Sequence, residues 1–266
     1  MPETTKIRAG KSLLAYADQW FAHNRRHTVN TQKLYSRVIN DFIQSLPADI
    51  GQLNPADIDI YINSLLSRMK NSAANSYLTA LKSFFKWLND TYELPNLAEK
   101  IKFLKEDPPE IRVLSHAEYQ KVIKANAENP DVWILKFLAN TGLRATEFCN
   151  VKPSDIEGKW LKVRGKGRKV RHVPLNRVAL ESLSHIKIPK NRDRLSYICQ
   201  KAAKIAGVPQ FGPHSLRHYC ATELLRRGAP IASVSRLLGH SSVTVTEKTY
   251  WHFNYTHIEN LTDFLL

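Results

Sequence analysis

Apolar side chains recur at the spacing of an amphipathic helix over most of the first hundred residues, with polar side chains between them. The third of these stretches begins with Asn54 as N-cap and Pro55 in the first helical position, a favoured start for a helix. Four amphipathic stretches in so short a segment predict a compact helical bundle over residues 1–96. We expect its helices around residues 13–21, 35–46, 54–69 and 72–90.

Prolines and mixed charges interrupt this pattern after the bundle. Pro108 and Pro109 cannot lie inside a helix, because proline lacks a backbone N–H and clashes with the preceding turn. We therefore expect a linker over residues 97–112 and a second domain over residues 113–266.

Helical patterns return beyond the linker, together with one stretch of strand character. Ser115 and Glu118 have the spacing of a capping box at the start of the first helix. Alternating apolar residues on both sides of a Gly-Lys-Gly turn predict a β-hairpin over residues 160–175. The expected fold class is mainly α with a small β-hairpin or sheet (α+β). We expect helices around residues 115–126, 131–142, 192–208, 214–228, 230–240 and 247–252, and an amphipathic tail at residues 254–266.

Charge is distributed unevenly along the chain, whose net charge is +15. Residues 1–99 carry 11 Lys and Arg against 9 Asp and Glu, whereas residues 100–266 carry 28 against 15. An excess of this size in one half favours a polyanionic partner, most often nucleic acid, over a merely solvated basic surface.

Several other classes of protein are disfavoured by the sequence. No apolar run has the length of a membrane-spanning helix, and the first residues lack the apolar core of a signal peptide. The cysteines (Cys149, Cys199 and Cys220) have no metal-ligand spacing, and free thiols are typical of a reducing compartment. We expect a cytoplasmic, nucleoid-associated protein with no membrane partner.

The first candidate chemical motif is TGLRATE, which follows the apolar helix that ends at Gly142. Arg144 offers a planar fork of donors that matches two phosphate oxygens. Glu147 lies one helical turn later, at a spacing suited to orienting that guanidinium group.

The second motif is the basic hairpin VRGKGRKVR, in which the glycines allow a tight turn with Lys166 at its tip. Such a tip fits a DNA groove, where flanking cations neutralise phosphates and a lysine close to phosphate could donate a proton. An exposed hairpin that is merely basic is the alternative. The expected DNA-binding residues of the hairpin are Arg164, Arg168, Lys169 and Arg171.

The last motifs are HSLRH, LLGHSS and TEKTYW. His214 and Arg217 are one helical turn apart, His240 follows a helix that ends in glycine, and Tyr250 comes ten residues later. Imidazole can accept a proton near neutral pH, and a phenol becomes a nucleophile when a base takes its proton. His214 and His218 have a spacing that suits a metal, but no nearby carboxylate or cysteine completes such a site, so no metal is expected.

Taken together and in order, the stretches TGLRATE, VRGKGRKVRHVPL, GPHSLRHYCATELLRRG and LLGHSSVTVTEKTY resemble the catalytic signature of the tyrosine recombinases, or phage-type integrases, of the Xer-like kind. The resemblance covers residues from about 112 to the C-terminus. It implies a catalytic domain there and a core DNA-binding domain in the N-terminal bundle.

The resemblance also implies a role for each matching residue. Tyr250 would attack the scissile phosphate to form a 3′-phosphotyrosine link, while Arg144 and Arg217 clamp the non-bridging oxygens and Glu147 supports Arg144.

Lys166 would be the general acid for the leaving 5′-oxygen. His214 would accept the tyrosine proton, and His240 would donate a hydrogen bond to the phosphate. In this chemistry the positive side chains take the place of a metal ion, and the phosphotyrosine ester retains the energy of the broken bond, so the resemblance implies no metal, ATP or other cofactor.

The implied function is site-specific recombination of double-stranded DNA sites by a homotetramer, or by a hetero-oligomer with a related recombinase. The amphipathic tail would fold onto its own domain or dock on a neighbouring subunit. Two alternatives are a DNA-relaxing enzyme like the type IB topoisomerases and a non-catalytic DNA-binding protein on the same fold. The sequence does not specify whether the task is integration, excision, transposition or dimer resolution.

Overall fold

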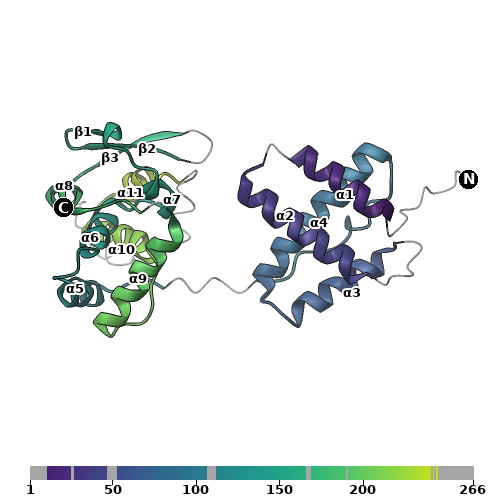
Figure 1. Cartoon of the computed structure of the whole chain (residues 1–266), viewed down its shortest axis with the longest axis horizontal. Coiled ribbons are helices and arrows are strands. Elements are labelled where there is room, and N and C mark those ends of the chain that lie inside the picture. Colours follow the sequence, from purple (N-terminus) through teal and green to yellow (C-terminus); the bar gives the residue numbers. More distant parts are fainter. Residues whose placement is uncertain are drawn as a thin grey trace, which may run out of the picture. The chain divides into compact units, whose positions relative to one another are not determined.

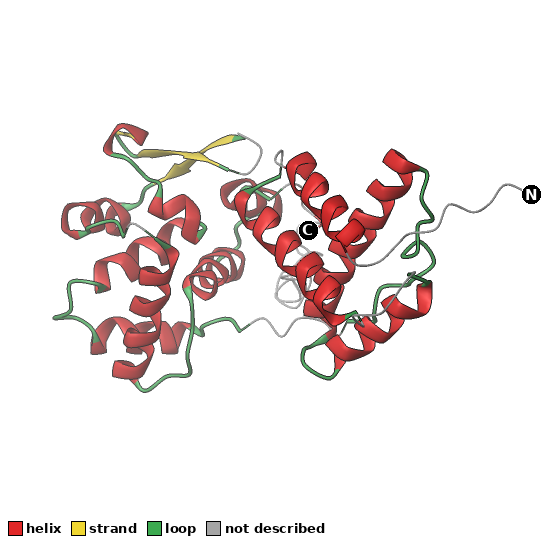
Figure 2. Ribbon diagram, turned by 45° about the vertical axis from the view of Figure 1, so that its right-hand side comes forward, coloured by secondary structure: helices red, strands yellow, loops and turns green. Residues whose placement is uncertain are grey.

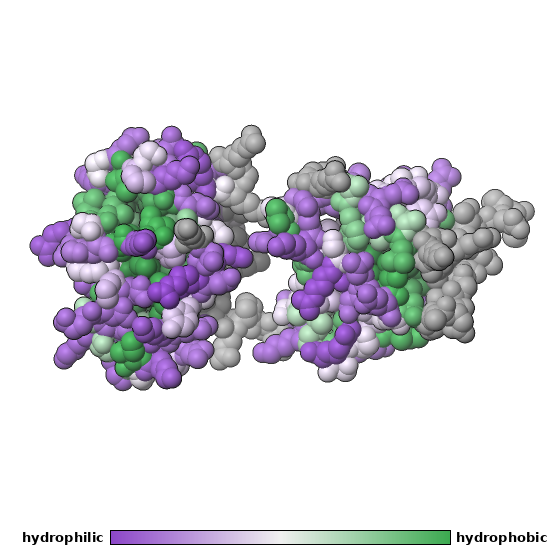
Figure 3. Space-filling view, viewed as in Figure 1, coloured by the Kyte–Doolittle hydropathy of each residue, from purple (hydrophilic) through white to green (hydrophobic). Residues whose placement is uncertain are grey.

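A computed structural model describes residues 11–24, 27–46, 53–106, 112–165, 169–189, 191–240, 242 and 244. The chain divides into two compact units, Met1–Pro109 and Glu110–Leu266, each with its own core (Figure 1). Hydrophilic side chains cover most of the visible face of each unit (Figure 3). None of the helices in the described ranges is long and apolar enough to cross a membrane.

The N-terminal unit is a helical bundle, and its four predicted helices are confirmed. Its longest helix, α4, contacts the other three and contributes Phe84 to a core that also buries Trp20 and Phe42 completely. The predicted start of the third helix is also confirmed, since Asn54 Oδ1 accepts a hydrogen bond from the backbone N–H of Ala56 at 2.8 Å. The helices are α1 (Lys11–His23), α2 (Val29–Ser45), α3 (Pro55–Leu66) and α4 (Asn71–Tyr92).

The segment after α4 packs back onto this unit. Asn75 on α4 holds it, because its side chain accepts a hydrogen bond from the N–H of Leu104 at 2.8 Å and donates one to the carbonyl of Leu104 at 2.9 Å. Ala98 is fully buried in the same core. Residues 97–106, which were predicted to be part of the linker, therefore belong to the N-terminal unit.

The C-terminal unit combines helices with one small antiparallel sheet (Figure 2). The predicted hairpin is confirmed as β2 and β3, in which Val163 is paired with Arg171. α6 packs between α8 and α10, and α11 contacts both α10 and β3. The elements are α5 (His116–Ala125), α6 (Val132–Thr141), α7 (Ala145–Cys149), η2 (Pro153–Asp155), β1 (Ile156–Glu157), β2 (Trp160–Arg164), β3 (Val170–Pro174), α8 (Arg177–His185), α9 (Arg192–Ala206), α10 (Pro213–Arg226) and α11 (Ile231–Leu238).

The mixed α and β class is as predicted, and the capping box at Ser115 is confirmed. The short helices α7 and α8 and the strand β1 were not predicted. The helix expected at residues 247–252 and the tail at residues 254–266 lie outside the described residues.

Candidate active site

The helices α6 and α11 each end at a glycine whose backbone lies in the left-handed region, as α9 does at Gly207. Gly142 ends α6 with φ of 62°, and Gly239 ends α11 with φ of 68°. A Cβ atom on Gly142 would lie 2.9 Å from Cδ2 of Leu238, so the ends of α6 and α11 are in close contact there. Glycine is needed at this position both for its backbone conformation and for the space.

The carbonyl end of α11 is the meeting point of three arginines. The last carbonyls of a helix have no partner within the helix and carry a partial negative charge, which suits a guanidinium group. Three consecutive carbonyls each accept a hydrogen bond from a different arginine. The bonds join Nε of Arg171 to Leu237 O at 2.8 Å, Nη2 of Arg217 to Leu238 O at 2.8 Å, and Nη2 of Arg144 to Gly239 O at 3.1 Å.

Arg217 is the most buried of the three, with 2% of its surface exposed. Its Nη1 also donates to the carbonyl of Gly142 at 2.7 Å, so one guanidinium group links the ends of α6 and α11. Arg217 comes from the first turns of α10. Three helices thus fix its position and leave its fork little freedom to rotate.

Glu147 on α7 lies between the other two arginines, and its side chain is 5% exposed. Its Oε1 accepts hydrogen bonds from Nη1 of Arg144 and Nη1 of Arg171, and its Oε2 accepts one from Nη2 of Arg171, all at 2.8 Å. Burial alone would raise the pKa of this carboxyl, but the hydrogen bonds from Arg171 and Arg144 outweigh burial and lower the pKa to about 2. Glu147 is therefore a carboxylate throughout the neutral range.

Two histidines of α10 lie next to this cluster. The rings of His214 and His218 meet edge to face, with their centroids 4.6 Å apart. Burial lowers the pKa of His214, and the charges of Arg217 and Arg144 lower it further. Burial, His214 and Arg217 lower the pKa of His218 to about 4. Both imidazoles are neutral at pH 7.

His240 follows Gly239 directly, and its backbone N–H bonds to the carbonyl of Ser235 at 3.2 Å. Burial lowers the pKa of His240 to about 4, together with the charges of Arg217, Arg144 and Arg171. The structure therefore brings Arg144, Glu147, His214, Arg217 and His240 into one cluster, although the sequence separates them widely.

The basic hairpin divides into two faces. Arg164 is 61% exposed and bonds to Asp155 at 3.0 Å, and Lys169 is exposed. Arg171, expected on the DNA-binding face, instead points into the protein with its side chain 12% exposed. Its Nε donates to Leu237 O and both Nη atoms donate to the carboxylate of Glu147, so the guanidinium group of Arg171 is directed at Glu147 and not away from the protein with Arg164. Lys166, Arg168 and Tyr250 lie outside the described residues.

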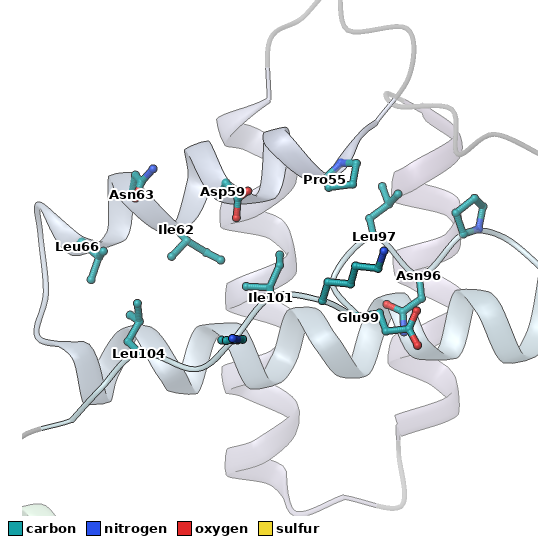
Figure 4. Close-up of a pocket in the computed structure, with 13 residues that line it drawn as sticks. Pro55, Asp59, Ile62, Asn63, Leu66, Asn96, Leu97, Glu99, Ile101 and Leu104 are labelled. Atoms are coloured by element: carbon teal, nitrogen blue, oxygen red, sulfur yellow. The ribbon is translucent and has the colours of Figure 1, made fainter.

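Within the described ranges, no group of three or more His, Cys, Asp or Glu side chains could hold a metal ion. A pocket of about 930 Å³ opens in the N-terminal unit between α3 and residues 95–104 (Figure 4). Apolar side chains such as Ile62 and Ile101 line it beside charged ones such as Asp59. Its lining has no histidine, cysteine or hydroxyl group, so the arginine cluster is the stronger candidate for chemistry.

Known proteins resemble both units. The model of the phage integrase family matches residues 112–257, and the model of the N-terminal SAM-like domain of phage integrases matches residues 19–93. The tyrosine recombinase XerA of Saccharolobus solfataricus is 29% identical over 86% of this chain and 82% of its own length. The tyrosine recombinase XerC of Thermodesulfovibrio yellowstonii is 27% identical over 88% of this chain and 89% of its own.

A similar fold occurs in a crystal structure of a lambda integrase (75–356) dimer bound to a COC′ core site. The TM-score is 0.77 at 20% identity, over 88% of this chain and 94% of the other.

Proposed function

The chain belongs to the phage integrase family, and from this premise we propose that it cuts and rejoins double-stranded DNA through a link between Tyr250 and a 3′-phosphate. The chain is an enzyme, a site-specific recombinase of the Xer-like tyrosine recombinase type. The observation that carries the proposed mechanism is the cluster of three guanidinium groups on the carbonyl end of α11, with neutral histidines beside it.

Arg144 and Arg217 bind the non-bridging oxygens of the scissile phosphate in this proposal. The side chain of Arg144 is 36% exposed, and Glu147 and the carbonyl of Gly239 hold its guanidinium group. Donors that are fixed before the substrate arrives do not have to reorganise as negative charge develops, and they therefore lower the barrier. Glu147 is a positioning residue, since it holds two arginines.

The neutral histidines complete the acid–base chemistry. His214 accepts the phenolic proton of Tyr250, and burial together with the charges of Arg217 and Arg144 lowers its pKa and so favours the unprotonated form that this role requires. His240 donates an N–H to a phosphate oxygen, as a neutral imidazole still has one such group.

The roles of Tyr250 and Lys166 stay predictions from the family signature. The tyrosine oxygen forms a bond to phosphorus as the bond from phosphorus to the 5′-oxygen breaks, and Lys166 protonates that oxygen. Rejoining reverses the step with a 5′-hydroxyl of another strand. The phosphodiester is exchanged for a phosphotyrosine ester of similar energy, so the cycle needs no ATP, and the guanidinium groups take the charge-stabilising place of a metal ion.

We infer that the partner is double-stranded DNA and that a homotetramer, or a hetero-oligomer with a related recombinase, acts on two sites. The excess positive charge of residues 100–266 supports a phosphate-dominated interface. Arg164, Arg168 and Lys169 on the hairpin are the proposed phosphate contacts.

The test is covalent trapping in cells. The wild type, Tyr250→Phe and the matched control Tyr255→Phe are expressed, the cells are lysed in strong detergent, and protein-bound DNA is recovered and sequenced. We expect adducts at one or a few sequences with the wild type and Tyr255→Phe, and none with Tyr250→Phe, which should still bind DNA.

Three outcomes would contradict the proposal. Adducts that persist in Tyr250→Phe but vanish in Tyr255→Phe would identify Tyr255 as the nucleophile in place of Tyr250. Adducts spread over all sequences would indicate a DNA-relaxing enzyme. Binding without any adduct, even from the wild type, would indicate a non-catalytic DNA-binding protein.

A further inference from the structure

Arg171 is a basic residue of the β2–β3 hairpin whose side chain does not face outward. It lies on β3 opposite the buried Val163, and its side chain is 12% exposed. All three of its side-chain nitrogens donate hydrogen bonds within the protein. Nε bonds to Leu237 O, Nη1 to Glu147 Oε1 and Nη2 to Glu147 Oε2, each at 2.8 Å.

These bonds connect three elements that are distant in the sequence. Arg171 belongs to β3, Glu147 to α7, and Leu237 to the last turn of α11. Glu147 also binds Arg144, and the two carbonyls that follow Leu237 bind Arg217 and Arg144. Arg171 therefore hydrogen-bonds directly to Glu147, which holds Arg144, and to the carbonyl end of α11, which holds both Arg144 and Arg217.

Gly239 makes room for this arrangement. A Cβ atom at position 239 would lie 2.9 Å from Nη1 and 3.0 Å from Cδ of Arg171. The guanidinium group thus lies directly against the backbone that leads to His240.

We propose that Arg171 is a positioning residue of the recombination reaction. It holds Glu147 and the carbonyl end of α11, and thereby keeps Arg144, Arg217 and His240 in their positions relative to one another. This proposal rests on the proposed function. The same bonds tie β3 to the arginine cluster, and β3 (Val170–Pro174) begins four residues after Lys166 in the sequence.

The physical reason is the cost of small displacements. A shift of about 1 Å in a catalytic group can slow a reaction by about a hundredfold. Without Arg171, the buried carboxylate of Glu147 keeps only Arg144 as a charged partner among the residues that the structure describes, and Leu237 loses its bond to β3. Lysine cannot replace the fork, because an ammonium group is a single point of charge.

The experiment compares full-length Arg171→Met and Arg171→Lys with the wild type and with Arg226→Met. Arg226 makes a matched two-point pair with Glu223, at 3.0 and 2.9 Å, away from the cluster. Covalent adducts are quantified at the sequence trapped by the wild type. Binding to a mixed-sequence DNA duplex is measured as a function of salt, and the pKa of His240 is measured by NMR in the free protein.

We expect both Arg171 variants to form adducts about a hundredfold more slowly, while Arg226→Met matches the wild type. The salt dependence of binding should not change in Arg171→Met. The pKa of His240 should rise in Arg171→Met, because a nearby positive charge is lost.

If Arg171→Met does not fold, the double variant Glu147→Gln/Arg171→Met removes both charges of the pair together and should show the same loss of adducts.

If the slope of the logarithm of the binding constant against the logarithm of the salt concentration is less steep by about 0.9 in Arg171→Met, then Arg171 contacts a phosphate and the proposal is overturned. Full activity of Arg171→Lys, or an unchanged pKa of His240, would overturn it too. If the wild type forms no adduct, the proposed function itself fails. Equal adducts from the wild type and Arg171→Met would refute only the positioning role.

Discussion

Replacing Glu147 by Gln gives a direct test of the electrostatics of the cluster. The substitution keeps the size of a side chain that is 5% exposed but removes the negative charge between Arg144 and Arg171. An amide also offers N–H donors to guanidinium groups that are themselves donors only. The variant should therefore be less stable than the wild type at neutral pH.

The pKa of Glu147 gives the size of the effect. Burial raises this pKa, but hydrogen bonds from Arg171 and Arg144 bring it down from 4.5 to about 2. One pKa unit corresponds to about 1.4 kcal/mol, so ionised Glu147 stabilises the folded chain by about 3 kcal/mol. We expect Glu147→Gln to lose about this amount of unfolding free energy at pH 7.

The assay is urea unfolding of the full chain between pH 7 and pH 3. Because the pKa is lower in the folded state, the stabilisation is complete above 4.5 and disappears as the pH falls toward 2. The difference between the wild type and Glu147→Gln should shrink by about half by pH 3. The exposed Glu128 provides the control Glu128→Gln, which should behave as the wild type. A difference that does not vary with pH, or one below about 1 kcal/mol, would refute the reasoning.

Three other substitutions or conditions test the remaining structure. Gly142→Ala should cost about 2 kcal/mol in urea unfolding, because its φ is 62° and a Cβ would lie 2.9 Å from Leu238; a neutral result would contradict the contact between α6 and α11. Phe84→Ala should cost about 3–5 kcal/mol in the transition of the N-terminal unit, seen by circular dichroism, since Phe84 is fully buried. The urea midpoint should fall as the pH drops from 6.5 toward 4.5, because burial and nearby arginines hold the pKa of His218 and His240 near 4, so that these histidines are protonated in the unfolded chain before they are protonated in the folded one. A midpoint that does not change with pH in the wild type, or one that changes equally steeply with pH in His240→Gln, would argue against this.

The N-terminal bundle was predictable because its helices carry the signals that physics requires of an isolated amphipathic helix. Apolar residues recur on one side, and Asn54 caps a helix whose first residue is proline. α7 has only five residues, which is too short for a periodic pattern to show. α8 does carry such a signal, because Asn176 caps it by accepting a hydrogen bond from the N–H of Ala179 at 2.9 Å, and this signal was overlooked.

The inward orientation of Arg171 was not predicted when it was grouped with the DNA-binding residues, although the sequence contained a signal for it. Residues two apart on a strand share a face, so Arg171 lies on the same face as Val173, which is fully buried. Val170, on the opposite face, is 49% exposed, and its apolar character obscured the alternation. A strict count of strand periodicity would have placed Arg171 inward.

The contacts with the end of α11 were not predictable from the motifs, because the acceptors are backbone carbonyls rather than side chains. LLGH reads as a helix end followed by a histidine, and nothing in it names its partners. The structure shows that Leu237, Leu238 and Gly239 each bond a different arginine.

This use of carbonyls explains how the cluster can hold three guanidinium groups and still attract a phosphate. If carboxylates neutralised every arginine, the site would have no charge left for DNA. One carboxylate, Glu147, is shared by Arg144 and Arg171, while Arg217 is held by the carbonyls of Gly142 and Leu238. Neutral carbonyls orient a cation without cancelling its charge, and the neutral histidines add no repulsion to the cluster. The four charged side chains keep two positive charges in excess, which matches a phosphodiester that gains a second negative charge when the tyrosine oxygen adds to it.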